Sequence, residues 1–226
     1  MRKFLVRVSH PFLRRWYAWW SRKPRRFRAD GLDLIVLPGV FHPGLFFSTA
    51  LLSEHIASLD LNGKSFLELG AGTGRIALIA ARNGAHVTAS DINSAAIGNL
   101  TLNSQRNGLP ITVAMSDLFE ALPQHFDVIA INPPYYPKEP MTDADKAFYS
   151  GGGHDYYARL FPQLAKRIER GSAVYIVLSE DVDRAPIVEL ARRSGLHFAP
   201  QRNRRYWGET QTVFSIDPVG SIGRRG

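Results

Sequence analysis

The feature that most constrains the fold is an alternation of strand and helix patterns from residue 32 onward. Short runs rich in Val, Ile and Leu alternate with longer segments whose apolar residues are three or four apart, as on one face of a helix. This order favours a mostly parallel sheet with helices on both faces. The predicted strands are residues 32–37, 64–69, 85–91, 111–117, 126–131 and 173–179, and the predicted helices are residues 49–59, 75–84, 94–108, 156–168 and 184–195.

The last part of the chain departs from this alternation. Two strand patterns, residues 197–207 and 210–217, follow each other without a helix between them. We therefore expect an antiparallel hairpin at one edge of the sheet. With 226 residues, of which 45% are hydrophobic, the chain can form one α/β domain with a sizeable core. We place this domain at residues 31–226, after a basic aromatic arm at residues 1–30.

The arm is predicted from its charge. Residues 1–28 contain ten Lys and Arg and no acidic residue, whereas the remaining chain has 18 basic and 20 acidic residues. The net charge of +8 therefore comes from the arm. Within it, Ser9 could cap a short helix that Pro24 ends. Such a segment can bind nucleic acid, lie in a membrane interface, act as a transit peptide, or cover the core with its Trp rings.

Glycines and acids gather where predicted strands end, which is where open parallel sheets bind ligands. The first strand of the core is followed by a G-x-G-x-G turn, at which backbone N–H groups can come close to a ligand. The next strand ends at Asp91, whose carboxylate could accept both hydroxyls of a ribose. The third ends at Asp117, which could accept from an adenine amino group.

The fourth strand ends in N-P-P-Y, and at this point the chain resembles a known family. The run E-x-G-x-G-x-G, D-I-N, S-D-L and N-P-P-Y is similar to the class I S-adenosylmethionine-dependent methyltransferases, in particular the HemK-like glutamine methyltransferases and their small-domain RNA-methylating relatives. The resemblance implies a seven-stranded, mostly parallel Rossmann-like sheet and S-adenosylmethionine as cofactor. The cofactor-binding residues that it implies are Glu68, Gly70, Ala71, Gly72, Gly74, Asp91, Ile92, Asp117, Leu118 and Asn132.

The resemblance also implies that Asn132, Pro133, Pro134 and Tyr135 are catalytic. The acceptor would be a planar –NH2 group, with one hydrogen accepted by the Asn132 oxygen and the other by a backbone carbonyl near Pro133. The prolines fix the direction of that carbonyl because their φ is locked. Tyr135, expected as an exposed ring, would stack on the planar group. No metal is required, and the lack of cysteine excludes cysteine nucleophiles and zinc thiolates.

The sequence leaves the acceptor open. Glutamine methyltransferases that act on release factors usually carry P-x-x-D-T before the glycine turn, whereas residues 41–52 have Ser48 and Thr49 but no acid. The basic arm favours RNA or a ribosomal particle, and a protein glutamine or a small metabolite remains possible. The alternative is a catalytically idle binding or scaffold subunit that keeps the fold. Because cysteines and a secretory signal pattern are both absent, we expect a cytoplasmic location.

Overall fold

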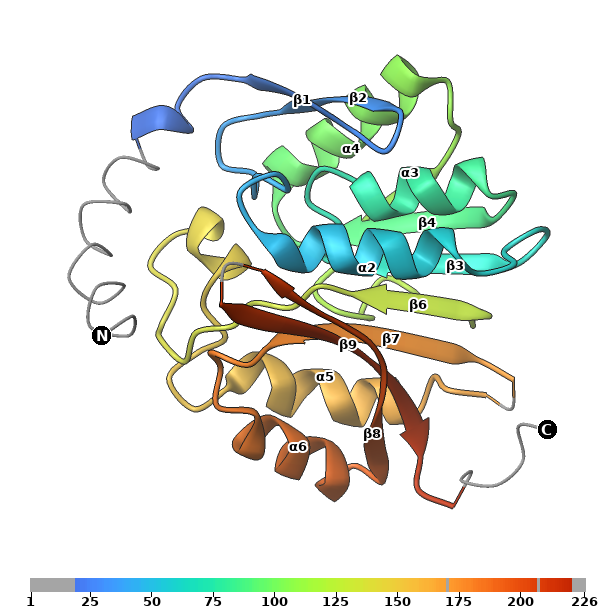
Figure 1. Ribbon diagram of the computed structural model, residues 1–226, viewed down its shortest axis with the longest axis vertical. Coiled ribbons are helices and arrows are strands. Elements are labelled where there is room, and N and C mark those ends of the chain that lie inside the picture. The colour runs from blue at the N-terminus through green and yellow to red at the C-terminus, as the bar shows by residue number, and fades with distance from the viewer. Residues whose placement is uncertain (1–18, 170, 207, 221–226) are drawn as a thin grey trace.

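A seven-stranded sheet forms the centre of the protein, of which the computed structural model describes residues 19–169, 171–206 and 208–220 (Figure 1). The strand order is β5-β4-β3-β6-β7-β9-β8. The first five strands in this order are parallel, and β9 runs antiparallel to β7 and β8. The strands are β3 (Ser65–Leu69), β4 (His86–Asp91), β5 (Thr112–Met115), β6 (Val128–Ile131), β7 (Ala173–Ser179), β8 (Leu196–Tyr206) and β9 (Glu209–Pro218). The predicted fold class and closing hairpin are confirmed.

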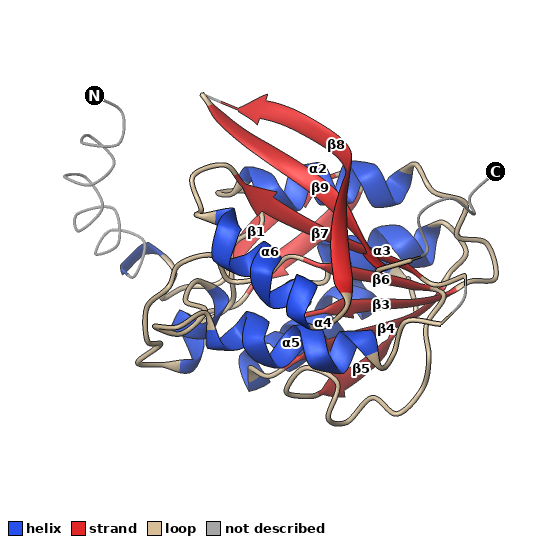
Figure 2. Ribbon diagram, turned by 90° about the horizontal axis from the view of Figure 1, so that it is seen from below, coloured by secondary structure: helices blue, strands red, loops and turns tan. Residues whose placement is uncertain are grey.

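Helices cover both faces of this sheet (Figures 1 and 2). One apolar core contains Leu51, Ile76 and Leu100 from three helices, and the other contains Leu160 and Ile187 from two more. None of the helices in the described residues is long and apolar enough to cross a membrane. The helices are α2 (Phe47–Ala57), α3 (Arg75–Arg82), α4 (Ser94–Asn107), α5 (Asp155–Ala165) and α6 (Arg184–Arg193), with a short 3₁₀ helix η1 (Asp143–Ala147) in the loop after β6.

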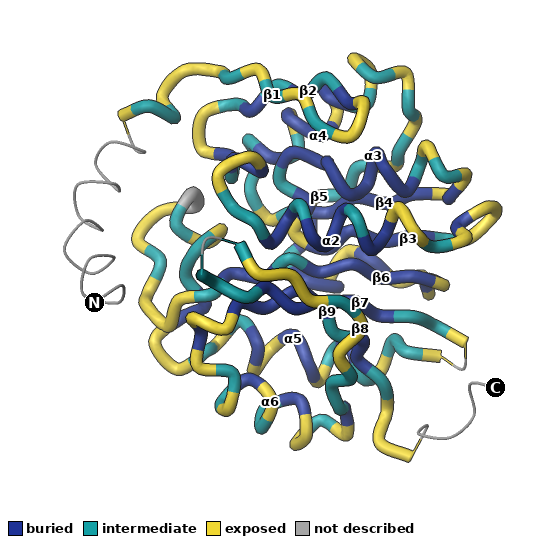
Figure 3. The backbone as a smooth tube through the Cα atoms, in the orientation of Figure 1, coloured by how far each residue is buried: buried dark blue, intermediate teal, exposed yellow. Residues whose placement is uncertain are grey.

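Strand β6 shows how the sequence produces this three-layer arrangement. Val128 and Ala130 point into the core beneath α2, α3 and α4, while Ile129 and Ile131 point into the core beneath α5 and α6. All four residues are buried, because a parallel strand in the middle of a sheet meets helices on both sides. Figure 3 shows that the central strands are buried along most of their length, whereas many of the loops are exposed. The apolar run ends at Ile131, and Asn132 follows it at the carboxyl end of this central strand.

A second, two-stranded sheet lies outside the main one and was only partly expected. Strand β1 (Arg25–Ala29) pairs antiparallel with β2 (Leu32–Val36) through a tight turn at Asp30 and Gly31, whose φ values are 53° and 74°. Positive φ at both central positions suits the twist of a two-residue hairpin. β1 lies within the segment that the sequence predicts to be a basic arm. The helix predicted from Ser9 falls mostly in residues 1–18, outside the described part of the chain.

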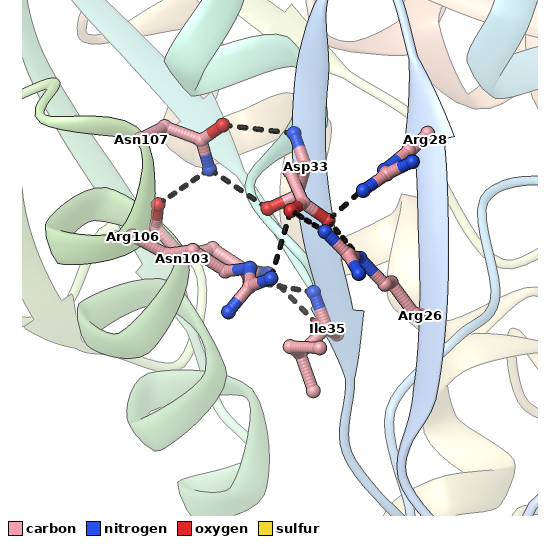
Figure 4. Close-up of polar contacts among 7 residues, drawn as sticks. All are labelled: Arg26, Arg28, Asp33, Ile35, Asn103, Arg106 and Asn107. Atoms are coloured by element: carbon pink, nitrogen blue, oxygen red, sulfur yellow. Dashed lines mark hydrogen bonds and ion pairs between the residues drawn. The ribbon is translucent and has the colours of Figure 1, made fainter.

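Helix α4 holds the free edge of β2 with a row of three asparagines, of which Figure 4 shows Asn103 and Asn107. The side-chain oxygens of Asn99, Asn103 and Asn107 accept from the backbone N–H groups of Leu37, Ile35 and Asp33 at 2.7, 2.8 and 2.9 Å. The side-chain nitrogens of Asn99 and Asn103 donate to the Ile35 carbonyl, and that of Asn107 donates to the Asp33 carbonyl. We call these three residues the asparagine row. They satisfy backbone groups that would otherwise need another strand.

The Asp33 carboxylate fastens the hairpin further (Figure 4). Its oxygens accept from Arg26 of β1 at 2.7 Å and from Arg106 of α4 at 2.7 Å, and Arg28 lies 3.8 Å away. The guanidinium groups of Arg26 and Arg106 hold the pKa of the Asp33 carboxyl well below its usual range. Part of the basic charge of the predicted arm is therefore paired within the fold.

Candidate functional site

A cavity of about 370 Å³ opens at the carboxyl ends of β3, β4, β5 and β6. Every cofactor or catalytic residue predicted from the sequence lines it except Gly74. The structure thus brings together the segments after four successive strands of the core. Further lining residues that the sequence predictions did not assign to the site come from the loop before α2, from α2 itself, from the loop after β6 and from α5: Val40, Phe41, Phe46, Ser48, Thr49, Phe148, Tyr156 and Arg159.

The glycine turn is shaped by backbone contacts. The N–H groups of Gly70 and Ala71 both donate to the Ser90 carbonyl at 2.9 Å, which ties the turn to the end of β4. Gly70, Gly72 and Gly74 all have positive φ, between 54° and 77°, a region that other residues enter at a cost. A Cβ at Gly74 would lie 2.7 Å from Leu100 Cδ2. Gly74 therefore begins α3 and permits its packing, and it does not face the cavity.

Glu68 holds the same turn from below. Its Oε2 accepts from the backbone N–H of Ala77 in the first turn of α3 at 2.6 Å. The carboxyl is buried, and this burial raises its pKa to about 8, with a further contribution from the charge of Asp91. Glu68 was predicted as a cofactor-binding residue, and its carboxyl also caps a helix that follows the turn.

Asp91 connects the glycine turn to the start of α4. Its Oδ2 accepts from the N–H of Gly72 and its Oδ1 from the N–H of Asn93, both at 2.9 Å. Burial raises the pKa of its carboxyl. The backbone N–H of Ile92 also bonds to this carboxylate, which has about four lone pairs in all, so Asp91 can still accept from a ligand. The backbone contacts fix the direction in which these lone pairs point.

Asp117 is paired with a residue that the sequence did not reveal. Arg159 of α5 donates to its Oδ2 at 2.6 Å, and both residues line the cavity. Tyr156, one turn earlier on α5, also lines the cavity. Burial raises the pKa of its phenol, and the charges of Asp91 and Asp117 raise it further. The distance in sequence between α5 and β5 explains why no local pattern predicts this contact.

The hairpin β1–β2 supports the glycine turn from the far side. Arg75, directly after the turn, donates through Nε to Asp30 Oδ2 at 2.8 Å. Asn103 of the asparagine row donates both to Ile35 of β2 and to the carbonyl of Thr73 within the turn, each at 2.9 Å. The hairpin is therefore attached to the cavity wall at two points.

Asn132 is held by side chains. Its Nδ2 donates to Thr49 Oγ1 of α2 at 3.0 Å, and its Oδ1 lies 3.5 Å from the hydroxyl of Tyr135. The Pro134 carbonyl accepts from the Tyr157 hydroxyl at 3.0 Å. Among the described residues, no hydrogen bond occupies the Pro133 carbonyl, the group expected to accept a hydrogen of the acceptor.

The expectation of an exposed Tyr135 ring is wrong. Tyr135 is half-buried and packs against the core, and its hydroxyl contacts Ser48 and lies 3.3 Å from the Val177 carbonyl. Burial raises the pKa of its phenol. The exposed ring is that of the next residue, Tyr136, which is 44% exposed and lines the same cavity. The chain turns after the two prolines in such a way that Tyr135 faces inward.

A wall of three phenylalanines completes the cavity beside Asn132. Phe41 and Phe46 are stacked with ring centroids 4.4 Å apart, and Phe148 lies 5.5 and 5.7 Å from them. The Phe148 carbonyl accepts from the backbone N–H groups of both Tyr135 and Tyr136, so this ring is tied to the N-P-P-Y loop. Within the described part of the chain, no group of three or more His, Cys, Asp or Glu side chains could hold a metal ion.

Comparisons with known proteins place this fold among the Rossmann-like methyltransferases. The 16S rRNA N2 G1207 methyltransferase of Thermus thermophilus, solved with AdoMet and guanosine, superimposes with a TM-score of 0.64 at 23% identity, over 86% of this chain and 50% of that one. The chain belongs to the methyltransferase small domain family, whose model matches residues 31–190. The family recognised from the sequence, the enzyme class and S-adenosylmethionine as cofactor are confirmed.

The names of two similar proteins indicate two kinds of methyl acceptor. A putative protein N5-glutamine methyltransferase of Methanocaldococcus jannaschii is 32% identical over 156 residues, which are 66% of this chain and 77% of the relative. A ribosomal RNA small subunit methyltransferase C of Hamiltonella defensa is 27% identical over 168 residues, 70% of this chain and 50% of the relative. This chain thus spans about half the length of the rRNA methyltransferase that it matches.

Proposed function

We propose that the protein transfers a methyl group from S-adenosylmethionine to a planar amino or amide nitrogen, in an RNA base or a protein glutamine. The observation that carries the proposal is the position of Asn132, whose side-chain amide lines the cavity beside the prolines and within reach of the segments expected to hold the cofactor. An amide oxygen and a backbone carbonyl can accept both hydrogens of an –NH2 group.

The cofactor half of the cavity suits a nucleoside. Asp91 has lone pairs left for the ribose hydroxyls, and Asp117 for the adenine amino group. A Cβ at Gly70 would meet no heavy atom within 4 Å, so the turn leaves open space beside its backbone. Ile92 and Leu118 supply apolar contacts for the base. When bound, S-adenosylmethionine supplies an activated methyl group together with its leaving group.

The remaining work of the chain is to position the acceptor. The lone pair of such a nitrogen is delocalised, so holding both hydrogens directs the nitrogen and lets it become tetrahedral. Correct orientation can supply a large share of the barrier reduction, on the order of 7–11 kcal/mol in favourable cases. The phenylalanine wall and Tyr136 offer flat surfaces for a planar group, and aromatic stacking on a base is worth about 1–3 kcal/mol.

Tritium-labelled cofactor tests the proposal directly. The full chain is incubated with unmodified ribosomal RNA transcribed in vitro and, separately, with a pool of glutamine-containing peptides. Label in nucleosides identifies an RNA base and label in peptides identifies glutamine. Asn132→Ala, which should transfer little label, is the negative control. Absence of cofactor binding by the wild type at millimolar concentration would contradict the proposal and favour the idle binding subunit, which the intact glycine turn and Asn132 make the weaker candidate.

The basic arm supports RNA as partner. The side chains of Arg26 and Arg28 in the hairpin are 50% and 68% exposed although they lie near Asp33, and Arg22 and Lys23 precede them. Phosphate contacts give a salt-dependent affinity, with a slope of about 0.7 per phosphate for single strands. Residues 1–18 contain five more Lys and Arg, so a truncation that removes them and keeps the residues of the hairpin should weaken RNA binding and flatten its salt dependence. Equal binding by both forms across a salt series would assign the arm another role.

A further inference from the structure

The start of α2 reaches across the cavity to the N-P-P-Y loop. Thr49 is 5% exposed and its Oγ1 is the acceptor for the Asn132 Nδ2 at 3.0 Å. Ser48, equally buried, contacts the hydroxyl of Tyr135. Two successive hydroxyl residues of one helix therefore hold two residues of the loop, Asn132 beside the acceptor region and Tyr135 on the inward side. The two contacts join segments more than eighty residues apart in the chain.

These hydroxyls are not used to begin the helix. The residue that precedes α2 is Phe46, whose side chain has no hydrogen-bonding group with which to cap the helix. Ser48 and Thr49 occupy its second and third positions, at which a hydroxyl can stay within the first turn. Both are directed instead toward the loop after β6. The loop after β6 therefore gains two contacts from the first turn of α2.

An asparagine that accepts hydrogens from a substrate must point the correct way. Its oxygen and nitrogen have nearly the same shape, but only the oxygen accepts. If the Asn132 amide turned over, its NH2 group would face the acceptor –NH2 group and two donors would oppose each other. The Asn132 amide bonds to Thr49 through its nitrogen at 3.0 Å, and the hydroxyl of Tyr135 lies near its oxygen at 3.5 Å. Because a hydroxyl both donates and accepts, these contacts fix the plane of the amide, which leaves a lone pair of the oxygen for the acceptor. The shorter of the two contacts is the one with Thr49.

We propose that Thr49 is a positioning residue that fixes the orientation of the Asn132 amide, so that its oxygen faces the acceptor. This inference rests on the proposed function, because it matters only if Asn132 holds the acceptor. Thr49 lines the cavity, but it acts through Asn132. The role follows from one hydrogen bond between α2 and the loop after β6, which no pattern in the sequence predicts.

The test compares three variants of the full chain. Thr49→Val keeps the shape and removes the hydroxyl, whereas Thr49→Ser keeps the hydroxyl. Ser53→Ala is the matched control, because Ser53 lies one turn further along the same helix, is 1% exposed, and has a hydroxyl that makes no hydrogen bond within the part of the chain that the structure describes. We expect Thr49→Val to lower kcat/KM for the acceptor about tenfold, with the Kd for S-adenosylmethionine within about twofold of wild type, while Thr49→Ser and Ser53→Ala stay within about threefold.

A second measurement needs no acceptor. In nitrogen-15-labelled protein, the side-chain NH2 signal of Asn132, assigned by its loss in Asn132→Asp, reports the contact with Thr49. It should move in Thr49→Val and stay close to its wild-type position in Thr49→Ser and Ser53→Ala. If Thr49→Val unfolds, Thr49→Ala takes its place in both measurements.

The outcomes separate this inference from the proposed function. If Asn132→Ala is inactive while Thr49→Val keeps wild-type kcat/KM and an unchanged NH2 signal, the positioning role is wrong and the proposed function stands. If Thr49→Ser is as impaired as Thr49→Val, the hydroxyl is not responsible and the inference also fails. If Asn132→Ala itself turns over like wild type, the proposed function fails and this role fails with it.

Discussion

Around the glycine turn, the cavity is fixed mainly by the backbone, whereas around Asn132 it is fixed mainly by side chains of other elements. Gly70 and Ala71 bond to the backbone of β4, and both oxygens of Asp91 accept from backbone N–H groups. Asn132 depends on Thr49 and Tyr135. The first half is built by residues close together in the chain, and the second requires α2, β6 and the loop after it to be packed together first.

This difference predicts separate effects of substitution. A change in the half held by the backbone should alter the affinity for the cofactor or the stability of the fold, because the residues expected to bind the cofactor also form the glycine turn. A change in the half held by side chains should alter turnover and leave cofactor affinity nearly unchanged. Results that mix the two would contradict this division of the cavity.

The largest effect is expected at Asn132. Asn132→Ala removes the oxygen that accepts from the acceptor and should lower kcat by roughly a hundredfold or more, about 2.7 kcal/mol at 1.36 kcal/mol per decade. The Kd for S-adenosylmethionine, measured by calorimetry, should change much less. Asn132→Asp keeps an acceptor oxygen and should retain partial activity. Wild-type turnover by Asn132→Ala would mean that the N-P-P-Y loop is only a kink.

Asp91→Ala addresses the cofactor half. It should weaken S-adenosylmethionine binding by about 1.5–3 kcal/mol, the range for hydrogen bonds that involve a charged group. At saturating cofactor, kcat should recover to near the wild-type value, unlike that of Asn132→Ala. Asp60→Ala removes an exposed carboxylate in the loop before β3, outside the cavity lining, and is a suitable control. An unchanged Kd in calorimetry would remove Asp91 from the binding site.

Two glycines of one turn sharpen the comparison within the cofactor half. Gly74→Ala adds a Cβ 2.7 Å from Leu100 at a φ of 77°, so it should destabilise the fold by about 2–4 kcal/mol, from backbone strain and overpacking together. Gly70→Ala has similar strain but open space around the Cβ, so its cost should be about 1–2 kcal/mol. Urea unfolding measures both. Equal losses of stability would show that Leu100 moves aside.

Glu68 makes the stability of the fold depend on pH. Burial raises the pKa of this carboxyl to about 8 in the folded protein, above its ordinary value of 4.5. The folded state therefore holds a proton that the unfolded state has lost, and the stabilisation from this group, complete below pH 4.5, is lost as pH rises through 8. The free energy of unfolding should fall between pH 5 and pH 8 in the wild type, and less so in Glu68→Gln. Parallel pH profiles would contradict the raised pKa.

The sequence predicts the segments whose residues lie close together in the chain better than those that depend on distant contacts. Strand β7 was predicted with the bounds that the structure gives, because its apolar run is continuous and buried on both faces. Strand β1 was missed, because its arginines hide the alternation of exposed and half-buried residues. The glycine turn and Asp91 could be located because their residues are local and chemically distinctive.

The second half of the site could be only partly predicted. Asn132 was identified, but the inward direction of Tyr135 depends on the Val177 carbonyl of a neighbouring strand. The roles of Thr49 and Arg159 depend on contacts 83 and 42 residues away in the chain. Such contacts leave no spacing in the sequence to read, because the packing of whole elements sets them.

In the asparagine row, the spacing of residues along a helix nearly matches the spacing of residues along a strand. Four residues of a helix rise about 6.0 Å, at 1.5 Å each, and two residues of an antiparallel strand advance about 6.8 Å. Asn99, Asn103 and Asn107 therefore keep step with Leu37, Ile35 and Asp33 for three rungs, and the two spacings differ by about 0.8 Å at each rung. The helix can imitate a strand over this length but not much further. It also sets the register of β2, because inserting one residue between Asp33 and Leu37 would misalign the rungs beyond it and loosen Thr73 of the glycine turn, which shares Asn103.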